Sequence, residues 1–139
     1  MEGYGLMVDY EYCTGCHACE VACKQEYRIP AGKEGGVRVL ELVQELPSGK
    51  VDVTYFPFFT RVCSFCAARI KKGQKPACAK HCMAGILEFG PPDDLASRLP
   101  ERRKVCLHAR RSAKEKSGKR GGPGTKNVSA SVPGQKPVF

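Results

Sequence analysis

The stretch Cys13-Thr14-Gly15-Cys16-His17-Ala18-Cys19-Glu20-Val21-Ala22-Cys23 decides the fold, because it places four thiols within eleven residues. A second group of four follows at Cys63, Cys66, Cys78 and Cys82, so the two groups hold eight of the nine cysteines. Cysteine thiolates are ligands for zinc and for iron–sulfur clusters. The sequence therefore predicts that bonds between thiolates and metal organise this chain.

The spacing of the first group separates the possible metals. Cys-x2-Cys-x2-Cys-x3-Cys is the run that holds a [4Fe–4S] cluster in bacterial ferredoxins, and in two-cluster ferredoxins its fourth cysteine ligates the other cluster. Mapped onto this chain, that rule predicts two [4Fe–4S] clusters that exchange one ligand each. One cluster takes Cys13, Cys16, Cys19 and Cys82, and the other takes Cys63, Cys66, Cys78 and Cys23.

Two other interpretations of the cysteines are less favoured by the residues. The second group, taken by itself, suits a structural zinc site equally well, because zinc sites often use two separated cysteine pairs. A secreted chain would use its cysteines for disulfides, but the first twelve residues lack the basic and apolar regions of a signal peptide. No apolar run reaches membrane-spanning length. We therefore expect a cytoplasmic chain whose thiols are free to bind metal.

Two segments, CTGCHACEVACKQE and CSFCAARIKKGQKPACAKHCMAGILEFG, resemble the iron–sulfur subunits of the dimethyl-sulfoxide-reductase type. The resemblance covers residues 5–108 and includes the long spacing between Cys66 and Cys78. It implies an electron-transfer subunit that works with the catalytic subunit of a molybdenum- or tungsten-pterin oxidoreductase. A tungsten aldehyde oxidoreductase would suit a cytoplasmic two-cluster subunit, but the residues do not choose between partners.

The sequence departs from that family in two respects. Typical members carry four clusters, whereas this chain has cysteines for two. Lys24 and Met83 follow the last cysteines of the two groups, where the family commonly has proline. The first departure implies a shorter electron relay, and the second should affect local packing and potential more than ligation.

The pattern of the chain predicts an α+β fold, a bacterial dicluster ferredoxin-like domain over residues 1–108 with an inserted β-hairpin at residues 37–60. A flexible basic tail is expected over residues 109–139. Strands are expected at Met7–Tyr10, Val37–Leu46, Val51–Thr60 and Ile86–Phe89, the last pairing with the first, and helices at Ala18–Tyr27, Cys66–Gly73 and Pro91–Leu99.

Charge separates the tail from the domain. The formal net charge is +9, and residues 1–100 contain equal numbers of acidic and basic side chains, so residues 101–139 carry the whole excess. A basic segment rich in Gly, Ser and Pro lacks the apolar residues that would fold it alone. We expect either a solubilising tail or an arm that orders on an acidic partner. Nucleic acid is not favoured, because no aromatic reading surface accompanies the basic run.

Several further residues have a functional and a plain structural interpretation. Cys106 is expected to be a spare thiol, since eight cysteines already saturate two clusters. His17 and His81 lie beside predicted ligands, where an imidazole can tune a cluster or simply face solvent. The aromatic run Tyr55, Phe56, Phe58 and Phe59 is expected to pack in the core, with partner docking as the alternative.

No motif for a catalytic triad, nucleophile elbow or phosphate loop appears in the sequence. We therefore expect no active site in this chain. Any catalysis would depend on its partner. The sequence predicts electron transfer through two [4Fe–4S] clusters as the small subunit of a larger oxidoreductase. The alternatives are a free, diffusible two-cluster ferredoxin and, less favoured, a zinc-binding interaction module.

Overall fold

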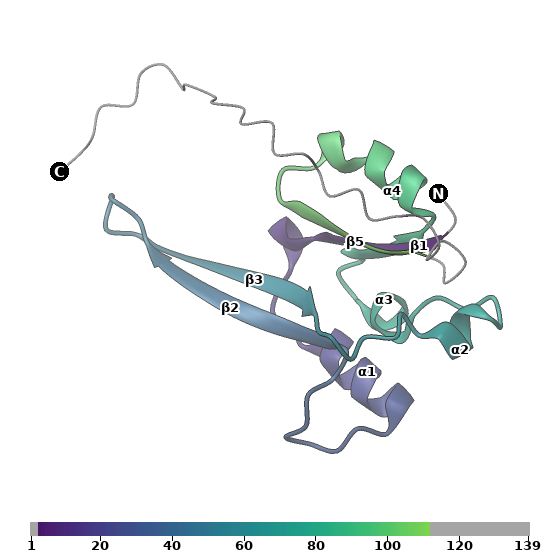
Figure 1. Cartoon of the computed structure of the whole chain (residues 1–139). Coiled ribbons are helices and arrows are strands. Elements are labelled where there is room, and N and C mark those ends of the chain that lie inside the picture. The colour runs from purple at the N-terminus through teal and green to yellow at the C-terminus, as the bar shows by residue number, and fades with distance from the viewer. Residues whose placement is uncertain (1–2, 112–139) are drawn as a thin grey trace, which may run out of the picture.

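A computed structural model describes residues 3–111 of the chain, and the predicted tail at 109–139 lies outside them except for its first three residues. The chain is α+β, with a three-stranded antiparallel sheet in the order β4-β1-β5 and a separate two-stranded hairpin (Figure 1). The elements are β1 Gly3–Asp9, η1 Tyr10–Tyr12, α1 Ala18–Tyr27, β2 Val37–Glu45, β3 Val51–Phe59, α2 Ala67–Ile70, α3 Ala77–His81, β4 Leu87–Gly90, α4 Pro92–Ser97, η2 Leu99–Glu101 and β5 Val105–Arg111.

β1 is the central strand, and its residues from Gly5 to Asp9 are all buried. Continuous burial requires cover on both faces, since side chains alternate along a strand. Leu6 and Val8 belong to the core that also contains the buried cysteines. On the opposite face, Leu95 of α4 lies close above Gly5, where a Cβ atom would meet its Cδ1 at 3.0 Å. The sheet thus forms the middle layer of the domain.

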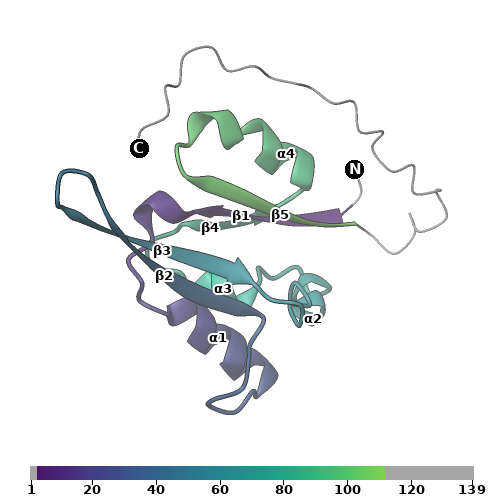
Figure 2. The same cartoon turned by 60° about the vertical axis from the view of Figure 1, so that its left-hand side comes forward.

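The three short helices that carry or flank cysteines lie on the other face of the sheet from α4. Figures 1 and 2 show α1, α2 and α3 on that side in both views. α1 and α3 pack directly against each other. This arrangement places the cysteine-bearing helices between solvent and one face of the sheet, in which β1 is the central strand.

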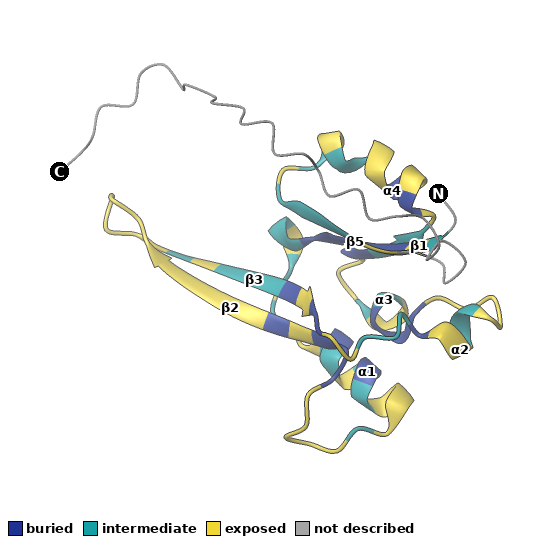
Figure 3. Cartoon of the chain, viewed as in Figure 1, coloured by how far each residue is buried: buried dark blue, intermediate teal, exposed yellow. Residues whose placement is uncertain are grey.

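The β2–β3 hairpin extends away from the body of the domain (Figures 1 and 2). Its base is buried at Val37, Val39 and Phe59, but the rest of β2 from Leu40 to Glu45 is exposed (Figure 3). An isolated two-stranded hairpin is marginally stable in water. Its base therefore has to be anchored by the core, and its outer part presents apolar side chains to solvent.

An ion-pair cluster ties the segment after α4 to the sheet. Arg102 donates to Asp9 Oδ2 at 2.6 Å and to Glu88 Oε1 at 2.9 Å, and Arg98 also pairs with Glu88. Asp9 is only 2% exposed, and its Oδ1 atom has no hydrogen-bond partner within the described part of the chain. A buried carboxylate needs such a partner to offset its lost hydration, so Arg102 fixes β5 and η2 in place.

The expected hairpin and the pairing of the segment near Ile86–Phe89 with the first strand are confirmed, with Val8 opposite Leu87 and Leu6 opposite Phe89. Three details differ. The first strand ends at Asp9, and Tyr10 begins a 3₁₀ turn. The helix expected over Cys66–Gly73 is a single turn, Ala67–Ile70, and a further turn, α3, follows Pro76. β5 was not expected, and it includes residues 109–111, which sequence analysis assigned to the tail.

We expect Leu95→Ala to lower the stability of the cluster-loaded chain by about 2–5 kcal/mol, because Leu95 is 3% exposed and its removal opens a cavity over β1. Thermal unfolding under anaerobic conditions measures the change. Leu46→Ala is the matched control, because Leu46 is 42% exposed and the same truncation there should change stability by less than about 0.5 kcal/mol. Equal melting temperatures for the two variants would contradict this description of the core.

Candidate metal centres

Four cysteines line one cavity near the N-terminal loop, and we call them the first cysteine set. Cys13 and Cys16 come from the loop after η1, Cys19 from the first turn of α1, and Cys82 from the position after α3. Thr14, His17, Val39, Pro57, Ala84, Ile86 and Leu87 complete the lining. Three thiols from one loop and a fourth from a distant segment therefore meet at one place.

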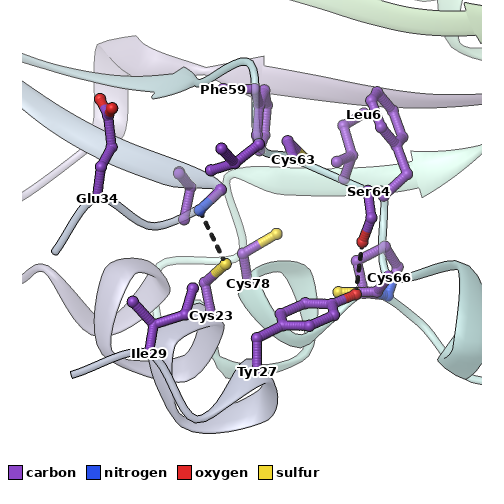
Figure 4. Close-up of a pocket in the computed structure, with 15 residues that line it drawn as sticks. Leu6, Cys23, Tyr27, Ile29, Glu34, Phe59, Cys63, Ser64, Cys66 and Cys78 are labelled. Carbon is purple, nitrogen blue, oxygen red and sulfur yellow. Dashed lines mark hydrogen bonds between the residues drawn. The ribbon is translucent and has the colours of Figure 1, made fainter.

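The other four cysteines, the second cysteine set, line a separate cavity of about 280 Å³. Figure 4 shows Cys23, Cys63, Cys66 and Cys78 around this space, with Leu6 and Phe59 above it and Tyr27 beside it. Cys23 comes from α1 and Cys78 from α3, whereas Cys63 and Cys66 come from the loop that precedes α2. Each set thus contains one cysteine from the opposite sequence group.

Left-handed backbone conformations shape both cysteine loops. The residue before the second cysteine of each loop has a positive φ, 68° at Gly15 and 55° at Phe65. Glycine adopts this conformation without strain, whereas a phenylalanine there is uncommon and costs about 1–3 kcal/mol. His17 and Cys66, which are the N-caps of α1 and α2, are also left-handed. Such turns direct successive thiols and backbone N–H groups toward one side of the loop.

Two glycines allow close packing beside the thiols. A Cβ atom at Gly15 would lie 2.6 Å from the ring of Tyr55, so the hairpin rests directly on the first cysteine loop. A Cβ atom at Gly36 would lie 3.1 Å from Cys63 Cα and 3.2 Å from Cys23 Sγ. The backbone N–H of Gly36 donates to Cys23 Sγ at 3.3 Å, and that of Ala77 donates to Cys66 Sγ at 3.5 Å.

Burial makes the thiols weak acids in the absence of metal. It raises the pKa of Cys19 to about 12, and the nearby carboxylate of Glu20 and the thiols of Cys13 and Cys82 act in the same direction. Burial likewise raises the pKa of Cys78 far above its usual range, with further contributions from Cys66 and Cys63. Four thiolates cannot share such a site unless a cationic group compensates their charge.

The two cysteine sets are neighbours. Cys78 of the second set is close enough to Cys19 of the first for the Cys19 thiolate to contribute to the raised pKa of Cys78. The contact follows from the packing of α1 against α3, since these helices carry the two cysteines. Cysteines carried by α1 therefore line both cavities.

The donor atoms of each set are four thiols, a number that both a [4Fe–4S] cube and a single zinc ion can use. Between residues 3 and 111, no three His, Cys, Asp or Glu side chains converge on a point where one ion would bind. Each set instead surrounds a cavity with four thiols, which is the donor number that a [4Fe–4S] cube requires. A single tetrahedral zinc ion would hold four sulfurs at about 2.3 Å from one centre.

Cys106, His17 and His81 lie in three different environments. Cys106 is on β5, with its Sγ 3.3 Å from His108 Nε2, and it lines neither cavity. His17 lines the first cavity, and its Nδ1 is 3.3 Å from Glu20 Oε2, whereas His81 is exposed at the end of α3.

The aromatic run divides between the core and the surface. Tyr55 packs against the core and Phe59 is part of it, and Phe56 makes an edge contact with Tyr10 at 5.1 Å between ring centroids. Phe58, in contrast, is 43% exposed. The core interpretation is therefore confirmed for Tyr55 and Phe59, whereas Phe56 is half-buried against Tyr10 and Phe58 faces solvent.

Sequence reasoning missed three residues that lie beside the second set. Gly36 was placed in a loop, but only its lack of a side chain permits the contact with Cys63. Tyr27 was assigned to a helix, and its hydroxyl group lies 2.7 Å from Ser64 Oγ in the cysteine loop. Arg110 was assigned to the tail, and its Nη1 donates to the carbonyl of Ser64 at 3.2 Å. The Gly35-Gly36 pair was the one sequence signal for a close approach of the backbone.

Comparison with known proteins confirms the resemblance stated from the motifs. The chain is similar to the menaquinone reductase iron-sulfur cluster-binding subunit of Nitratidesulfovibrio vulgaris, with 34% identity over 87 residues that cover 57% of this chain and 30% of that protein. It is also similar to a subunit of the anaerobic dimethyl sulfoxide reductase of Haemophilus influenzae, with 32% identity over 92 residues, 63% of this chain and 41% of that protein.

The chain spans less than half the length of the curated relatives it matches. No protein-family model matches it. Its sequence similarity is nevertheless to iron–sulfur electron-transfer subunits of the dimethyl-sulfoxide-reductase type. Among residues 3–111 the longest helix, α1, has ten residues, and none is long and apolar enough to cross a bilayer.

We expect Gly36→Ala to displace Cys23 and Cys63 and to lower the iron content at the second cysteine set, because the new methyl group meets the backbone of Cys63. Iron analysis and electron paramagnetic resonance (EPR) of anaerobically purified protein measure the loss. Gly35→Ala is the matched control, since a Cβ atom there meets nothing closer than Lys24 Cγ at 3.5 Å. Full iron content in Gly36→Ala would show that the contact tolerates a methyl group.

Proposed function

We propose that this chain transfers electrons through two [4Fe–4S] clusters as the small subunit of a molybdenum- or tungsten-pterin oxidoreductase. The observation that carries the proposal is that eight cysteines form two sets of four, each around its own cavity. Cys13, Cys16, Cys19 and Cys82 would hold one cluster, and Cys23, Cys63, Cys66 and Cys78 would hold the other. The clusters would supply one-electron chemistry, and the protein would supply their spacing and surroundings.

The positions of the two sets suit a relay. Cys16 is exposed, so the first set reaches the surface of the domain. Cys19 and Cys78 lie at the boundary between the sets, in the packed interior. An electron that entered beside Cys16 would pass to the second set without crossing solvent.

The hairpin supports the proposed complex with a catalytic subunit. Leu40, Leu42, Val43, Val53 and Phe58 are each between 37% and 61% exposed. These apolar side chains lie on an extension outside the body of the domain, where they contribute nothing to its core (Figure 3). Exposed apolar surface of this kind is typical of an interface. A freely diffusing ferredoxin gains nothing from such a hairpin, which favours the subunit over that alternative.

The chain should contain about eight irons and show the broad visible absorption of [4Fe–4S] clusters. Cys82→Ser should remove the cluster held mainly by the N-terminal loop, and Cys23→Ser should remove the cluster held mainly by the second group. In each variant about four irons and one EPR signal should remain. These crossed losses would follow from the exchange of one ligand between the two sets.

Cys106→Ser is the control for both variants, because its thiol lines neither cavity, and it should keep its full iron content. Retention of both clusters in Cys23→Ser would refute the crossed ligand assignment. A colourless protein with stoichiometric zinc would refute the cluster proposal and favour the zinc-binding module instead.

Leu42→Asp should weaken binding to the catalytic subunit at least about tenfold, because it would bury an unpaired carboxylate in the interface. The chain would be purified anaerobically from its source with an affinity tag, and the co-purified protein would be analysed for Mo, W and Fe. Ser48→Asp, in the exposed hairpin turn, is a control that adds the same single negative charge. A wild-type chain that elutes alone in size-exclusion chromatography would favour the diffusible ferredoxin.

A further inference from the structure

A negative charge is fixed beside the first cysteine set. Glu20 follows Cys19 on α1, and its side chain is 21% exposed. Its Oε1 accepts a hydrogen bond from the backbone N–H of Val39, a residue that lines the first cavity, and its Oε2 lies 3.3 Å from His17 Nδ1. These contacts hold the carboxylate near the position that the cluster would occupy.

A positive charge lies beside the second cysteine set. Arg110 reaches from β5 to the carbonyl of Ser64, which stands between Cys63 and Cys66 in the cysteine loop. Burial raises the pKa of Cys63, and the guanidinium group of Arg110 acts in the opposite direction, as expected for a cation near that thiol. The two sites therefore have charges of opposite sign as neighbours.

Hydrogen bonds to cysteine sulfur atoms add to the electrostatic difference between the two sets. The N–H groups of Gly36 and Ala77 donate to Cys23 and Cys66, both members of the second set. The amides of Gly15 and Phe65 lie against Cys13 and Cys63 in equivalent positions of the two loops, so their effects cancel. Donors to the sulfur atoms stabilise the reduced, more negative form of a cluster.

Burial opposes the effect of these charges and hydrogen bonds on the reduction potentials. Cys16 of the first set is exposed, whereas Cys23, Cys66 and Cys78 of the second set are buried. A buried site disfavours the additional negative charge of the reduced cluster. An electron would therefore favour the first set unless nearby charges and hydrogen bonds opposed the effect of burial.

Charged groups other than Glu20 and Arg110 also lie near the two sets, and Lys24 and Arg38 share a surface pocket with Glu20. Glu34 lines the second cavity, but it is exposed and its carboxylate points away from the cysteines in Figure 4. Arg69 and Glu26 form an ion pair at 2.9 Å, so their charges compensate each other.

From these contacts we infer that Glu20 and Arg110 are an opposed pair of positioning charges that biases the transferred electron toward the second cysteine set. Glu20 lowers the reduction potential at the first set, and Arg110 raises it at the second. The transfer is internal and balanced, because the electron lost by iron at the first set is gained by iron at the second. This inference rests on the proposed function.

Redox titration of the full, cluster-loaded chain, followed by EPR, tests the inference. The two signals are assigned by their loss in Cys82→Ser and Cys23→Ser. Glu20→Gln should raise the first-set potential, and Arg110→Gln should lower the second-set potential. Each should shift the distribution of the electron toward the first set by up to about tenfold, which is 59 mV for a one-electron couple. The titration is run at about pH 8, where histidine side chains are ordinarily neutral.

Three controls separate charge from structure. Arg110→Lys keeps the charge and should keep the second-set potential near that of the wild type. Lys50→Gln removes a positive charge from the hairpin turn and should move neither potential. Because Arg110 is exposed, the effect of its loss should also decrease as the salt concentration rises.

An unchanged potential in Glu20→Gln or Arg110→Gln, or a shift of the opposite sign, would overturn the inference. Such a result with full iron content would leave the proposed function intact. A chain that binds far less iron than two clusters require would instead overturn the proposed function itself.

Discussion

The convergence of thiols from both cysteine groups on each cavity is the constraint on which the rest of the domain depends. Cys19 and Cys23 are four residues apart on α1, and Cys78 and Cys82 are four residues apart on and just after α3. Residues at this spacing lie one helical turn apart on the same face. Because the two helices pack with Cys19 near Cys82 and Cys23 near Cys78, each helix delivers one thiol to each cavity. Neither site is complete without the other half of the chain.

This constraint explains why so small a domain has a covered sheet. β1 supplies Leu6 and Val8 to the core beneath the cysteines, and its other face is closed by Leu95 of α4. Three of the ten buried residues that form this core are cysteines, so its purely apolar part is small. Small domains commonly compensate for a limited core with metal–ligand bonds. The sheet and α4 then hold the cysteine helices in register, and bound metal would supply much of the remaining stability.

The sequence predicted the features that depend on local spacing and failed where tertiary contacts decide. The hairpin, α1 and the grouping of cysteines follow from alternation, helix periodicity and ligand spacing. β5 was missed because Arg110 and Arg111 continue into a basic segment, and its strand conformation depends on pairing with β1. α3 was missed because five residues after Pro76 carry too little periodicity to identify a helix. Gly36 and Arg110 were missed for a related reason, since their contacts join segments far apart in the chain.

The base and the outer part of the hairpin would have different roles. The cysteine loops are shaped by left-handed residues and by Tyr55 against Gly15, so the base of the hairpin belongs to the first site. The outer part of the same hairpin carries exposed apolar side chains, with Leu42 at 49% and Val43 at 61%. A partner that packed on this extension would thus contact an element whose base rests on the first cysteine loop. The hairpin would then serve both docking and electron entry. Its anchoring in the core would set the distance from the partner to the exposed Cys16.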